Sequence, residues 1–353
     1  MRIEPLLEQV VRRGGSDLHI QVGLPPIVRQ QGELLALGQE ELTEADTEAL
    51  IFAVLDDDQK SILLKNKEVD CGFAFGDMGR FRVNAFHEKG HLAISLRLIP
   101  SSVATVEQLG LPRIVGDFAN FSQGIVLFTG PTGSGKSSSM AALIDKINSE
   151  RKERILTIED PIEFQHRSKR SIVVQREIHY DTFSFAAALK SALRQDPDIV
   201  LVGELRDLET IAAALTIAET GHLVFATLHT NSASSTINRL IDVFPPHQQA
   251  QIRVQLGNVL KAVCAQHLIP KIGGGRVCAT EILIVDSAVR NLIRESKIHQ
   301  IDSIIQNNSA KGMQGMDQTL AKMVQENIVS YEDAFRSAHN LADFEKMAGQ
   351  FRK

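Results

Sequence analysis

A glycine-rich segment near the middle of the chain carries the clearest chemical signal. It reads GPTGSGKSSS from residue 130, and its first eight residues match the pattern G-x-x-x-x-G-K-[ST] in full. Glycines let backbone N–H groups turn towards an anion, and a following helix adds its positive N-terminal end. The residues predicted to hold the phosphates of a nucleoside triphosphate are Gly130, Pro131, Thr132, Gly133, Ser134, Gly135, Lys136, Ser137 and Ser138.

Two side chains of this segment have predicted roles of their own. Lys136 would reach the β- and γ-phosphates, and the hydroxyl of Ser137 would be a ligand of Mg²⁺. The segment follows an apolar stretch typical of a strand, GIVLFTG, and precedes a run compatible with a helix. This context supports ATP and Mg²⁺ as cofactors.

Acidic residues and a histidine are expected at the same edge of a sheet as the phosphates. Short apolar stretches (RILTI, DIVLVG, HLVFATL) alternate with helical stretches, which is typical of a mostly parallel α/β sheet. Ligands of open α/β sheets lie outside the carboxyl ends of the strands. Those ends carry Glu159 and Asp160, Glu204, and His229. Several chemical groups beside the phosphates favour hydrolysis over binding alone.

The two glutamates with the clearest settings have different predicted tasks. Glu204 directly follows an apolar strand and is predicted to organise Mg²⁺, directly or through water. Glu163 follows Pro161, which prevents simple continuation of the strand, so we expect it on a turn that aims it at water as the general base. A carboxylate on a solvated turn is the alternative for Glu163.

The two histidines of TGHLVFATLHTN need separate interpretations. A continuous strand would place His222 and His229 roughly 20 Å apart, so both cannot contact one phosphate in one subunit. His229 is predicted to sense the γ-phosphate, and His222 is predicted to be structural or interfacial.

Composition limits the class of protein. The 353 residues suffice for about two domains of roughly 150 residues each. The net charge of −5, without a long block of like charge, argues against a nucleic-acid tail or a polybasic membrane anchor. Cys71, Cys264 and Cys278 stand too far apart for a C-x-x-C site, which fits a reducing compartment. No run approaches the ~18 apolar residues of a membrane span, so we expect a cytoplasmic protein without one.

The pattern of strands and helices divides the chain. Residues 1–98 are predicted to form a small α+β domain, with a helical pattern over 43–65. Residues 99–112 resemble a linker, residues 113–280 an α/β core, and residues 281–353 a mainly helical region.

Two neighbouring strands of the first domain each carry an arginine on a polar face. In GRFRVNAF, Phe81, Val83 and Ala85 share one face and Arg82 lies on the other. In HLAISLRLIP, Arg97 lies opposite the apolar face. On the pattern alone, a solvated sheet face explains both arginines.

The ordered motifs identify a family. GPTGSGKS, TIEDPIE, DPDIVLVGELRD and TGHLVFATLHTN resemble the Walker A, Asp box, Walker B and His box of the ATPases of type II secretion and type IV pili. GRFRVNAF, LIDVFPPHQQ, KIGGGRV and AVRNLIRE are similar to the pilus-retraction branch of that family, the PilT type. The resemblance covers essentially the whole chain. The four-cysteine metal loop and extra N-terminal domains of the extension and type II secretion motors are not found in it, which favours the retraction branch.

The resemblance implies a homo-hexamer of chains with a PAS-like N-terminal domain and a RecA-like P-loop ATPase domain. It implies ATP hydrolysis that drives pilus retraction and twitching motility at the inner membrane, with a pilus platform protein and a PilU-type paralogue as partners. It assigns Glu163 as catalytic acid/base, Glu204 as the Walker B acid and His229 as a nucleotide-state sensor. Arg82 and Arg97 match a pair that reaches the γ-phosphate when the domains close.

The motif AVRNLIRE adds a candidate coupling helix. Helical spacing predicts an apolar face of Ala288, Val289, Leu292 and Ile293. It predicts a polar face of Arg290, Asn291, Arg294 and Glu295. The resemblance ties this motif to force output, so Arg290, Asn291 and Arg294 are predicted to contact a partner or a neighbouring subunit. The retraction branch commonly has isoleucine where this chain has valine, a mild apolar change.

Three alternatives remain open from the sequence. The first is an accessory PilU-like role in retraction. The second is a RecA-fold nucleic-acid motor, which would need a basic groove that the net charge of −5 does not favour. The third is an ATP-sensing regulator without hydrolysis, which leaves the convergent acids unexplained.

Overall fold

The structure, a computed structural model, describes residues 2–30, 32–99 and 102–349, which fold into two compact units. The first unit comprises residues 1–102 together with 161–165, and the second comprises 103–160 and 166–353. Within the segment expected as a linker, residue 99 ends a strand of the first unit. Val106 and Leu111 are buried in the core of the second unit. The chain from residue 103 is therefore packed as part of the second unit.

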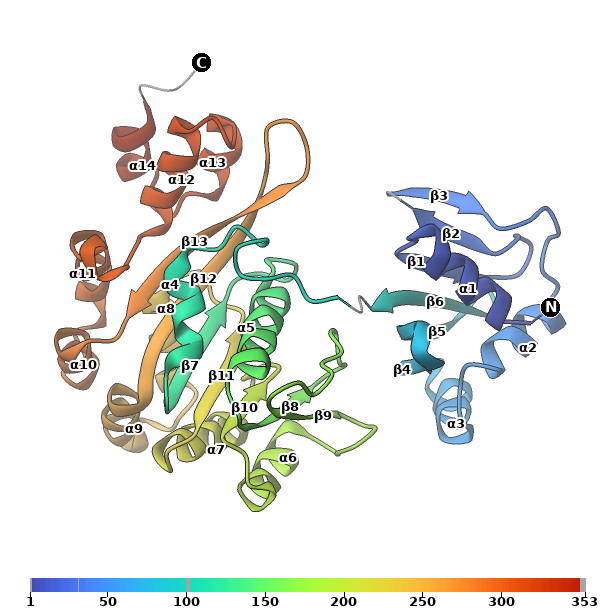
Figure 1. Ribbon diagram of the computed structural model, residues 1–353, viewed down its shortest axis with the longest axis horizontal. Coiled ribbons are helices and arrows are strands. Elements are labelled where there is room, and N and C mark those ends of the chain that lie inside the picture. Colours follow the sequence, from blue (N-terminus) through green and yellow to red (C-terminus); the bar gives the residue numbers. More distant parts are fainter. Residues whose placement is uncertain (1, 31, 100–101, 350–353) are drawn as a thin grey trace. The chain divides into compact units, whose positions relative to one another are not determined.

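The described residues of the first unit form one antiparallel sheet with three α-helices and a short 3-10 helix (Figure 1). Its sheet order is β3-β2-β1-β6-β5-β4, and every neighbouring pair is antiparallel. The strands are β1 (Asp17–Ile20), β2 (Ile27–Gln30), β3 (Glu33–Ala36), β4 (Glu68–Phe75), β5 (Gly79–Glu88) and β6 (His91–Ile99). The helices are α1 (Glu4–Arg13), α2 (Glu44–Phe52), α3 (Asp57–Asn66) and the short 3-10 helix η1 (Gly76–Met78).

The helical pattern over 43–65 folds as two helices, α2 and α3. Thr43 caps the first through a reciprocal pair of hydrogen bonds with Asp46. Asp56 caps the second in the same way with Gln59. Because an N-cap residue has extended backbone, the second cap interrupts what the sequence pattern presents as one helix.

The second unit is built on a seven-stranded sheet of order β13-β12-β7-β11-β10-β8-β9. All neighbours are parallel except β12 and β13, which form an antiparallel hairpin. The strands are β7 (Gly124–Thr129), β8 (Arg154–Glu159), β9 (Ile172–Glu177), β10 (Ile199–Val202), β11 (Leu223–Leu228), β12 (Leu260–Pro270) and β13 (Arg276–Ile284). The central strands β7 and β11 are buried along their whole length, as parallel strands covered on both faces must be.

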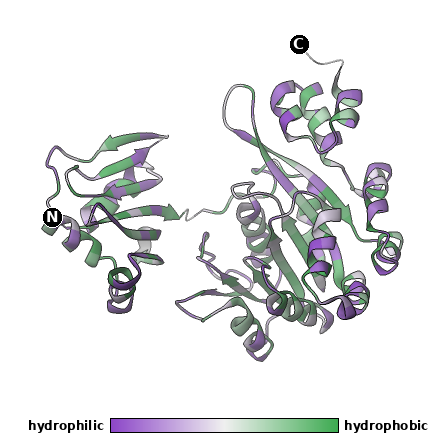
Figure 2. Ribbon diagram, turned by 180° about the vertical axis from the view of Figure 1, so that it is seen from behind, coloured by the Kyte–Doolittle hydropathy of each residue, from purple (hydrophilic) through white to green (hydrophobic). Residues whose placement is uncertain are grey.

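Helices cover both faces of this sheet. From β7, Val126 and Phe128 pack with α5 residues on one face, and Ile125 and Leu127 pack with α7, α8 and α9 on the other. Figure 2 shows the apolar strands enclosed between helices with polar outer sides. The helices are α4 (Arg113–Asp117), α5 (Lys136–Glu150), α6 (Phe185–Ala192), α7 (Leu208–Glu219), α8 (Ala233–Asp242) and α9 (Pro246–Val259).

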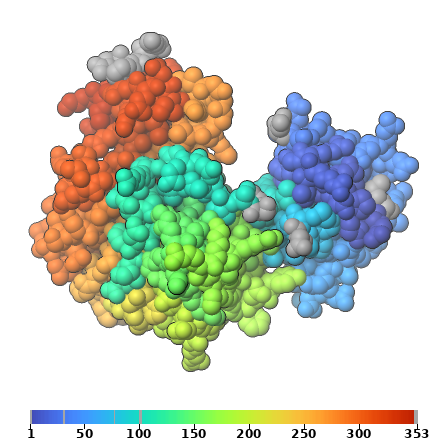
Figure 3. Space-filling view, viewed as in Figure 1, coloured from blue at the N-terminus to red at the C-terminus, as the bar shows by residue number. Residues whose placement is uncertain are grey.

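The chain after β13 is helical and lies together on one side of the second unit (Figure 3). It contains α10 (Ser287–Arg294), α11 (Ile301–Asn307), α12 (Met316–Gln325), α13 (Tyr331–Ser337) and α14 (Leu341–Ala348). The remaining 3-10 helices are η2 (Phe118–Asn120), η3 (Leu193–Gln195), η4 (Ile298–Gln300) and η5 (Ser309–Lys311). In the part of the chain that the structure describes, we find no helix with the length and apolarity to cross a membrane.

Candidate active site

The glycine-rich segment forms the loop between β7 and α5. Gly130 has φ of +138°, and Gly135, the last residue before the helix, has φ of +92°. A Cβ on Gly130 would lie 2.3 Å from the carbonyl oxygen of Gln266 and 2.7 Å from Oγ of Ser134. Only glycine suits such a conformation at so close an approach, and the missing side chains leave the backbone N–H groups accessible to an anion.

The polar groups of this loop fit the phosphates of a nucleotide. Lys136 is 8% exposed and donates hydrogen bonds to the carbonyls of Gly130, at 2.8 Å, and Pro131, at 2.9 Å. Its ammonium therefore lies against the loop rather than in solvent. Ser134 Oγ is buried without a hydrogen-bond partner among the described residues. Ser137 and Ser138 lie in the first turn of α5, where a helix attracts anions.

Glu204 and His229 lie together at the carboxyl ends of adjacent strands. Glu204 follows β10 and His229 follows β11, and these two strands are parallel neighbours. Glu204 Oε2 lies 3.6 Å from His229 Nε2, and Glu204 Oε1 lies 2.5 Å from Nε of Arg206. The Glu204 side chain is 13% exposed, whereas that of His229 is 46% exposed. A mostly buried carboxylate and an accessible imidazole thus share one edge of the sheet.

The backbone on either side of Glu204 is held by both neighbouring strands. The N–H of Gly203 donates to the carbonyl of Ile158, at the end of β8, at 2.8 Å. The N–H of Leu205 donates to the carbonyl of Thr227, in β11, at 2.9 Å. These bonds fix the direction in which the Glu204 side chain leaves the sheet.

The acids that follow β8 have different environments. Glu159 accepts hydrogen bonds from Thr157 Oγ1 at 2.6 Å and from Gln175 Nε2 at 3.2 Å, so its carboxylate is engaged within the sheet. Glu163 is exposed and lies in an irregular segment. That segment, 161–165, belongs to the first compact unit.

His222 lies at the opposite end of β11 from His229. Its Nδ1 is 3.0 Å from the carbonyl oxygen of Ile217 and 3.0 Å from Oγ1 of Thr220. These contacts join the imidazole to the C-terminal end of α7, which gives His222 a structural setting.

Arg82 and Arg97 lie directly opposite each other in the first unit, as partners in the register of β5 and β6. Two like charges in this relation repel unless other groups compensate them. Arg82 pairs with Asp70, at 2.6 Å between Nη2 and Oδ2, and Arg97 pairs with Asp17, at 2.8 Å between Nε and Oδ1. The Arg97 side chain remains 70% exposed.

The ion pair of Arg97 changes the acidity of its partner. Burial, the largest influence on Asp17, would raise the pKa of this carboxyl. Hydrogen bonds from Arg97 and Ser16, together with the positive charges of Arg97 and His19, outweigh burial and hold the pKa of Asp17 below its ordinary value. Asp17 is therefore ionised at neutral pH and keeps Arg97 in place on the sheet.

The helix of the AVRNLIRE motif, α10, buries a narrower stripe than its sequence predicts. Val289 and Ile293 are fully buried, but Ala288 is exposed, which corrects its placement on the packed face. Arg290 is half-buried rather than solvated, because α10 packs closely on α9. A Cβ on Gly257 of α9 would lie 3.5 Å from Cγ of Arg290 and 3.4 Å from Cγ of Arg294.

The guanidinium groups of this helix have different surroundings. Arg290 Nε is buried without a hydrogen-bond partner among the described residues. Arg294 is exposed and donates a hydrogen bond to the side-chain oxygen of Asn291. The two stems are thus packing groups, and the polar surface of the helix is centred on Asn291 and the end of Arg294.

Sequence reasoning missed a buried glutamine beneath the nucleotide loop. Gln266 of β12 is 1% exposed, and its Nε2 donates to Oγ of Ser139 at 2.7 Å. Ser139 Oγ in turn donates to the carbonyl of Gly135 at 3.1 Å. The chain of bonds links β12 to the first turn of α5. The available signal was weak, because Gln266 stands beside His267 as a polar pair in the otherwise apolar stretch AVCAQHLIP.

Comparison with known proteins gives a consistent family. The model of the family described as type II/IV secretion system protein matches residues 66–274. The type IV pilus retraction ATPase PilT of Pseudomonas aeruginosa is 48% identical over 96% of this chain and 98% of its own length. The type IV pilus ATPase PilU of the same organism is 37% identical over 98% of this chain and 91% of its own length.

A solved structure agrees over the same extent. The crystal structure of the pilus retraction motor PilT with bound ADP matches with a TM-score of 0.92 and 44% identity. The match covers 98% of this chain and 99% of that one. This likeness confirms the predicted fold class, an α/β P-loop ATPase domain after a smaller α+β domain, with a mainly helical C-terminal region.

Proposed function

Because this chain belongs to the type II/IV secretion ATPase family, and is an ATPase of the pilus-retraction kind, we propose that it hydrolyses ATP to retract a type IV pilus as a homo-hexameric motor. The observation that carries the proposal is the extent of the likeness to a retraction motor. It includes the N-terminal unit and the C-terminal helices as well as the nucleotide loop. A shared nucleotide site alone would support only ATP hydrolysis.

The placement of the second unit's residues supports a set of proposed roles. Lys136 and the backbone of residues 130–135 bind the β- and γ-phosphates. Ser137, with Glu204 acting directly or through water, would hold Mg²⁺, which neutralises charge on the phosphates. His229 contacts Glu204 and is partly exposed, so it can report whether a γ-phosphate is present beside that carboxylate.

The first unit supplies the remaining groups. Glu163 is the proposed general base, since it is an exposed carboxylate that follows the strand end of β8. Arg82 and Arg97 are proposed to grip the γ-phosphate when the domains close. Contacts made only in one nucleotide state are the means by which a ligand shifts a conformational equilibrium.

The assembly and its partners belong to the same proposal. The hexamer would work in the cytoplasm at the inner-membrane base of the pilus, against a pilus platform protein. A PilU-type paralogue is a further expected partner. The higher identity to PilT than to PilU, 48% against 37%, favours the main retraction motor over the accessory one. Arg290, Asn291 and Arg294 are proposed to transmit the stroke to a partner or a neighbouring subunit.

Deleting the gene in its host tests this function. We expect more surface pili and loss of twitching motility, because assembly would continue without retraction. Counts of surface pili by electron microscopy and colony spreading measure the two effects. Loss of pili would show an extension motor, and normal motility would show that retraction does not depend on this chain.

Arg97→Ala should lower ATP turnover by at least about tenfold while the hexamer persists. A charge-assisted contact is worth roughly 1.5–3 kcal/mol, and about 1.4 kcal/mol corresponds to a tenfold rate change. Turnover of the purified protein and size-exclusion chromatography measure the two properties.

Arg12→Ala is the matched control for this variant. Arg12 is an exposed arginine of the same unit. Its Nη2 lies 3.2 Å from Oε2 of Glu8 on the same helix. The Arg12→Ala protein should hydrolyse ATP at the wild-type rate. If Arg97→Ala and Arg82→Ala both hydrolyse ATP at the wild-type rate, the two arginines belong to a solvated sheet face and have no role in turnover.

A further inference from the structure

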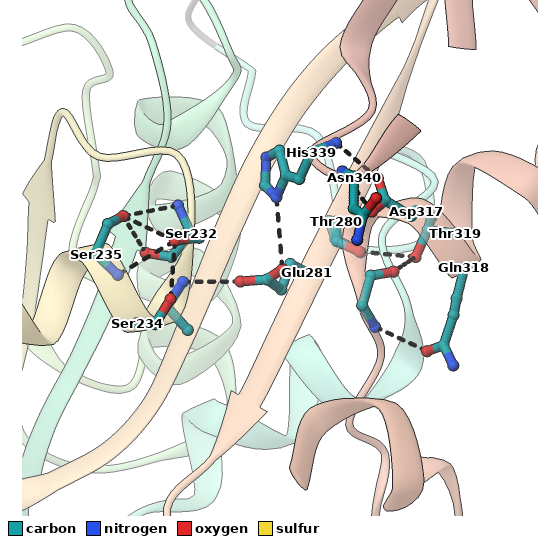
Figure 4. A network of polar contacts seen from close by, with 12 residues as sticks. Ser232, Ser234, Ser235, Thr280, Glu281, Asp317, Gln318, Thr319, His339 and Asn340 are labelled. Atoms are coloured by element: carbon teal, nitrogen blue, oxygen red, sulfur yellow. Dashed lines mark hydrogen bonds and ion pairs between the residues drawn. The ribbon is translucent and has the colours of Figure 1, made fainter. Parts of the chain in front are cut away.

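A buried carboxylate joins the ATPase core to the C-terminal helices. Glu281, in β13, is 7% exposed and lies between α8 and the C-terminal segment (Figure 4). Its Oε1 accepts a hydrogen bond from the backbone N–H of Ala233 at 2.8 Å. His339 Nδ1 lies 3.8 Å from its Oε2. One side chain thus links the first residue of α8 to the segment that precedes α14.

The α8 side of this junction is continuous with the proposed phosphate sensor. Ala233 is the first residue of α8, only four residues after His229. The loop between them is tied to the helix, because Thr230 Oγ1 lies 2.6 Å from Thr236 Oγ1. Thr236 Oγ1 also donates to the carbonyl of Ser232 at 2.6 Å. A displacement of the N-terminus of α8 therefore displaces the loop that carries His229.

The other side of the junction belongs to the C-terminal helices. Asp317, in the first turn of α12, accepts hydrogen bonds from the backbone N–H of His339 at 2.7 Å and of Asn340 at 2.9 Å. Thr319 Oγ1 donates to the carbonyl of Thr280 at 2.8 Å, next to Glu281 in the strand. The start of α12, the residues that cap α14 and the middle of β13 therefore form one connected group.

Little apolar packing fills the space between these two sides. A cavity of about 800 Å³ is lined by the loop after His229, the N-terminus of α12 and the segment around His339. Dispersion contacts cannot act across such a space, so polar links carry a larger share of the connection between α8 and α12. Glu281 is a polar link that contacts both the first residue of α8 and His339 of the C-terminal segment.

The position of Glu281 is tightly constrained by its charge. Burial raises the pKa of this carboxyl above its ordinary value, and the charge of Asp302 adds to that effect, whereas the N–H of Ala233 and the nearby His339 favour the ionised form. An ionised carboxylate at this buried position that lost the N–H of Ala233 would be left with an uncompensated charge. The N-terminus of α8, the carboxylate and the segment around His339 should therefore move together.

We propose that Glu281 is a positioning residue that holds the loop of His229 in register with the C-terminal helices, so that the nucleotide state is communicated between them. The inference rests on the proposed role of His229 as the phosphate sensor. Glu281 is at no point required to touch ATP. It acts through the α8 N-terminus and the loop that precedes it.

Kinetics of Glu281→Gln test this inference. The amide keeps the size of the side chain and can accept from one N–H, but it loses the charge and places an NH₂ group where the second acceptor stood. We expect kcat to fall about tenfold and the KM for ATP to change by less than about twofold, because the phosphate loop is untouched. Asp302→Asn, an exposed carboxylate on the same cavity, should change neither constant by more than about twofold.

A second background separates positioning from a general loss of stability. If Glu281 acts through His229, then Glu281→Gln should change kcat by less than about twofold in a His229→Ala protein. Additive losses, or a wild-type kcat for Glu281→Gln alone, would overturn the inference. A wild-type rate for His229→Ala would refute the sensor role and the inference with it. These readouts use purified protein, so they leave the proposal of pilus retraction to be decided by the deletion.

Hydrogen exchange of the wild-type protein avoids any failure of a variant to fold. Peptides covering 229–236 and 312–320 should change their protection together when a non-hydrolysable ATP analogue replaces ADP. A response confined to 229–236 would show that the C-terminal helices are not coupled to the sensor loop, and would overturn the inference.

Discussion

Glu163→Gln should bind ATP as tightly as the wild-type chain and hydrolyse it at least about 100 times more slowly. General acid–base groups contribute roughly 10²–10⁴-fold to catalysed rates, and the amide removes the proton acceptor while keeping the size of the side chain. The phosphate loop, from Gly130 to Ser137, is unchanged by this substitution. Binding of a fluorescent ATP analogue and release of phosphate from the same preparation measure the two properties.

Two further variants serve as comparisons for that experiment. Lys136→Ala should lose nucleotide binding itself, because Lys136 provides the positive charge of the loop. Glu159→Gln changes the other glutamate of the same motif, whose carboxylate is engaged by Thr157 and Gln175. A wild-type rate for Glu163→Gln would show that the base lies elsewhere, with Glu159 and Glu204 as the next carboxylates to test.

Replacing Arg290 and Arg294 together with alanine should abolish pilus retraction and leave ATP turnover within about twofold of wild type. The nucleotide residues of β7, β10 and β11 lie outside α10, whose buried contacts come from Val289 and Ile293. If the polar groups of α10 transmit force, their loss uncouples hydrolysis from movement. Twitching motility in cells and turnover of the purified double variant are the two measurements.

The packing of α10 on α9 defines the control. Both arginine stems lie against Gly257, so alanine removes packing as well as charge. The matched variant Arg290→Gln with Arg294→Gln keeps most of each stem and removes both charges. It should also lose retraction. Normal motility in the glutamine variant would show that packing matters here rather than charge, and loss of turnover in either variant would place α10 in the catalytic cycle or the fold.

Local patterns were enough to predict the nucleotide loop and the sheet that carries it. The glycines around Lys136 favour the loop conformation locally. The strands β7 and β11 consist of apolar residues, so the sequence predicts that they are buried on both faces of the sheet. The alternation in β5 likewise predicts the faces of Phe81, Val83 and Ala85, which are fully buried. The meeting of Glu204 with His229 followed from the rule that parallel strands end at one edge.

Features that depend on pairing between distant segments were not predictable in the same way. The register that sets Arg82 opposite Arg97 is determined by the whole antiparallel sheet and cannot be read from either strand. Glu281 is a single charged residue in the apolar stretch VCATEILIV, and its partners lie 48 residues earlier and in the segment between α13 and α14. For Ala288 the helical spacing predicted burial, but the side chain is exposed. Helical spacing gives a periodicity, but the neighbouring α9 determines how wide the buried stripe becomes.

The aspartates beside Arg82 and Arg97 have a consequence for how the motor would reset. Any phosphate that these arginines grip must compete with Asp70 and Asp17, which already hold the two guanidinium groups. If the arginines bind phosphate as proposed, its departure would return them to carboxylates of their own sheet instead of to solvent. Such competing carboxylates would lower the affinity of the arginines for phosphate and would speed the dissociation of phosphate. A motor that binds and releases phosphate in every cycle would benefit from this lower affinity. Asp17→Asn would remove the charge that competes for Arg97 and make phosphate release slower.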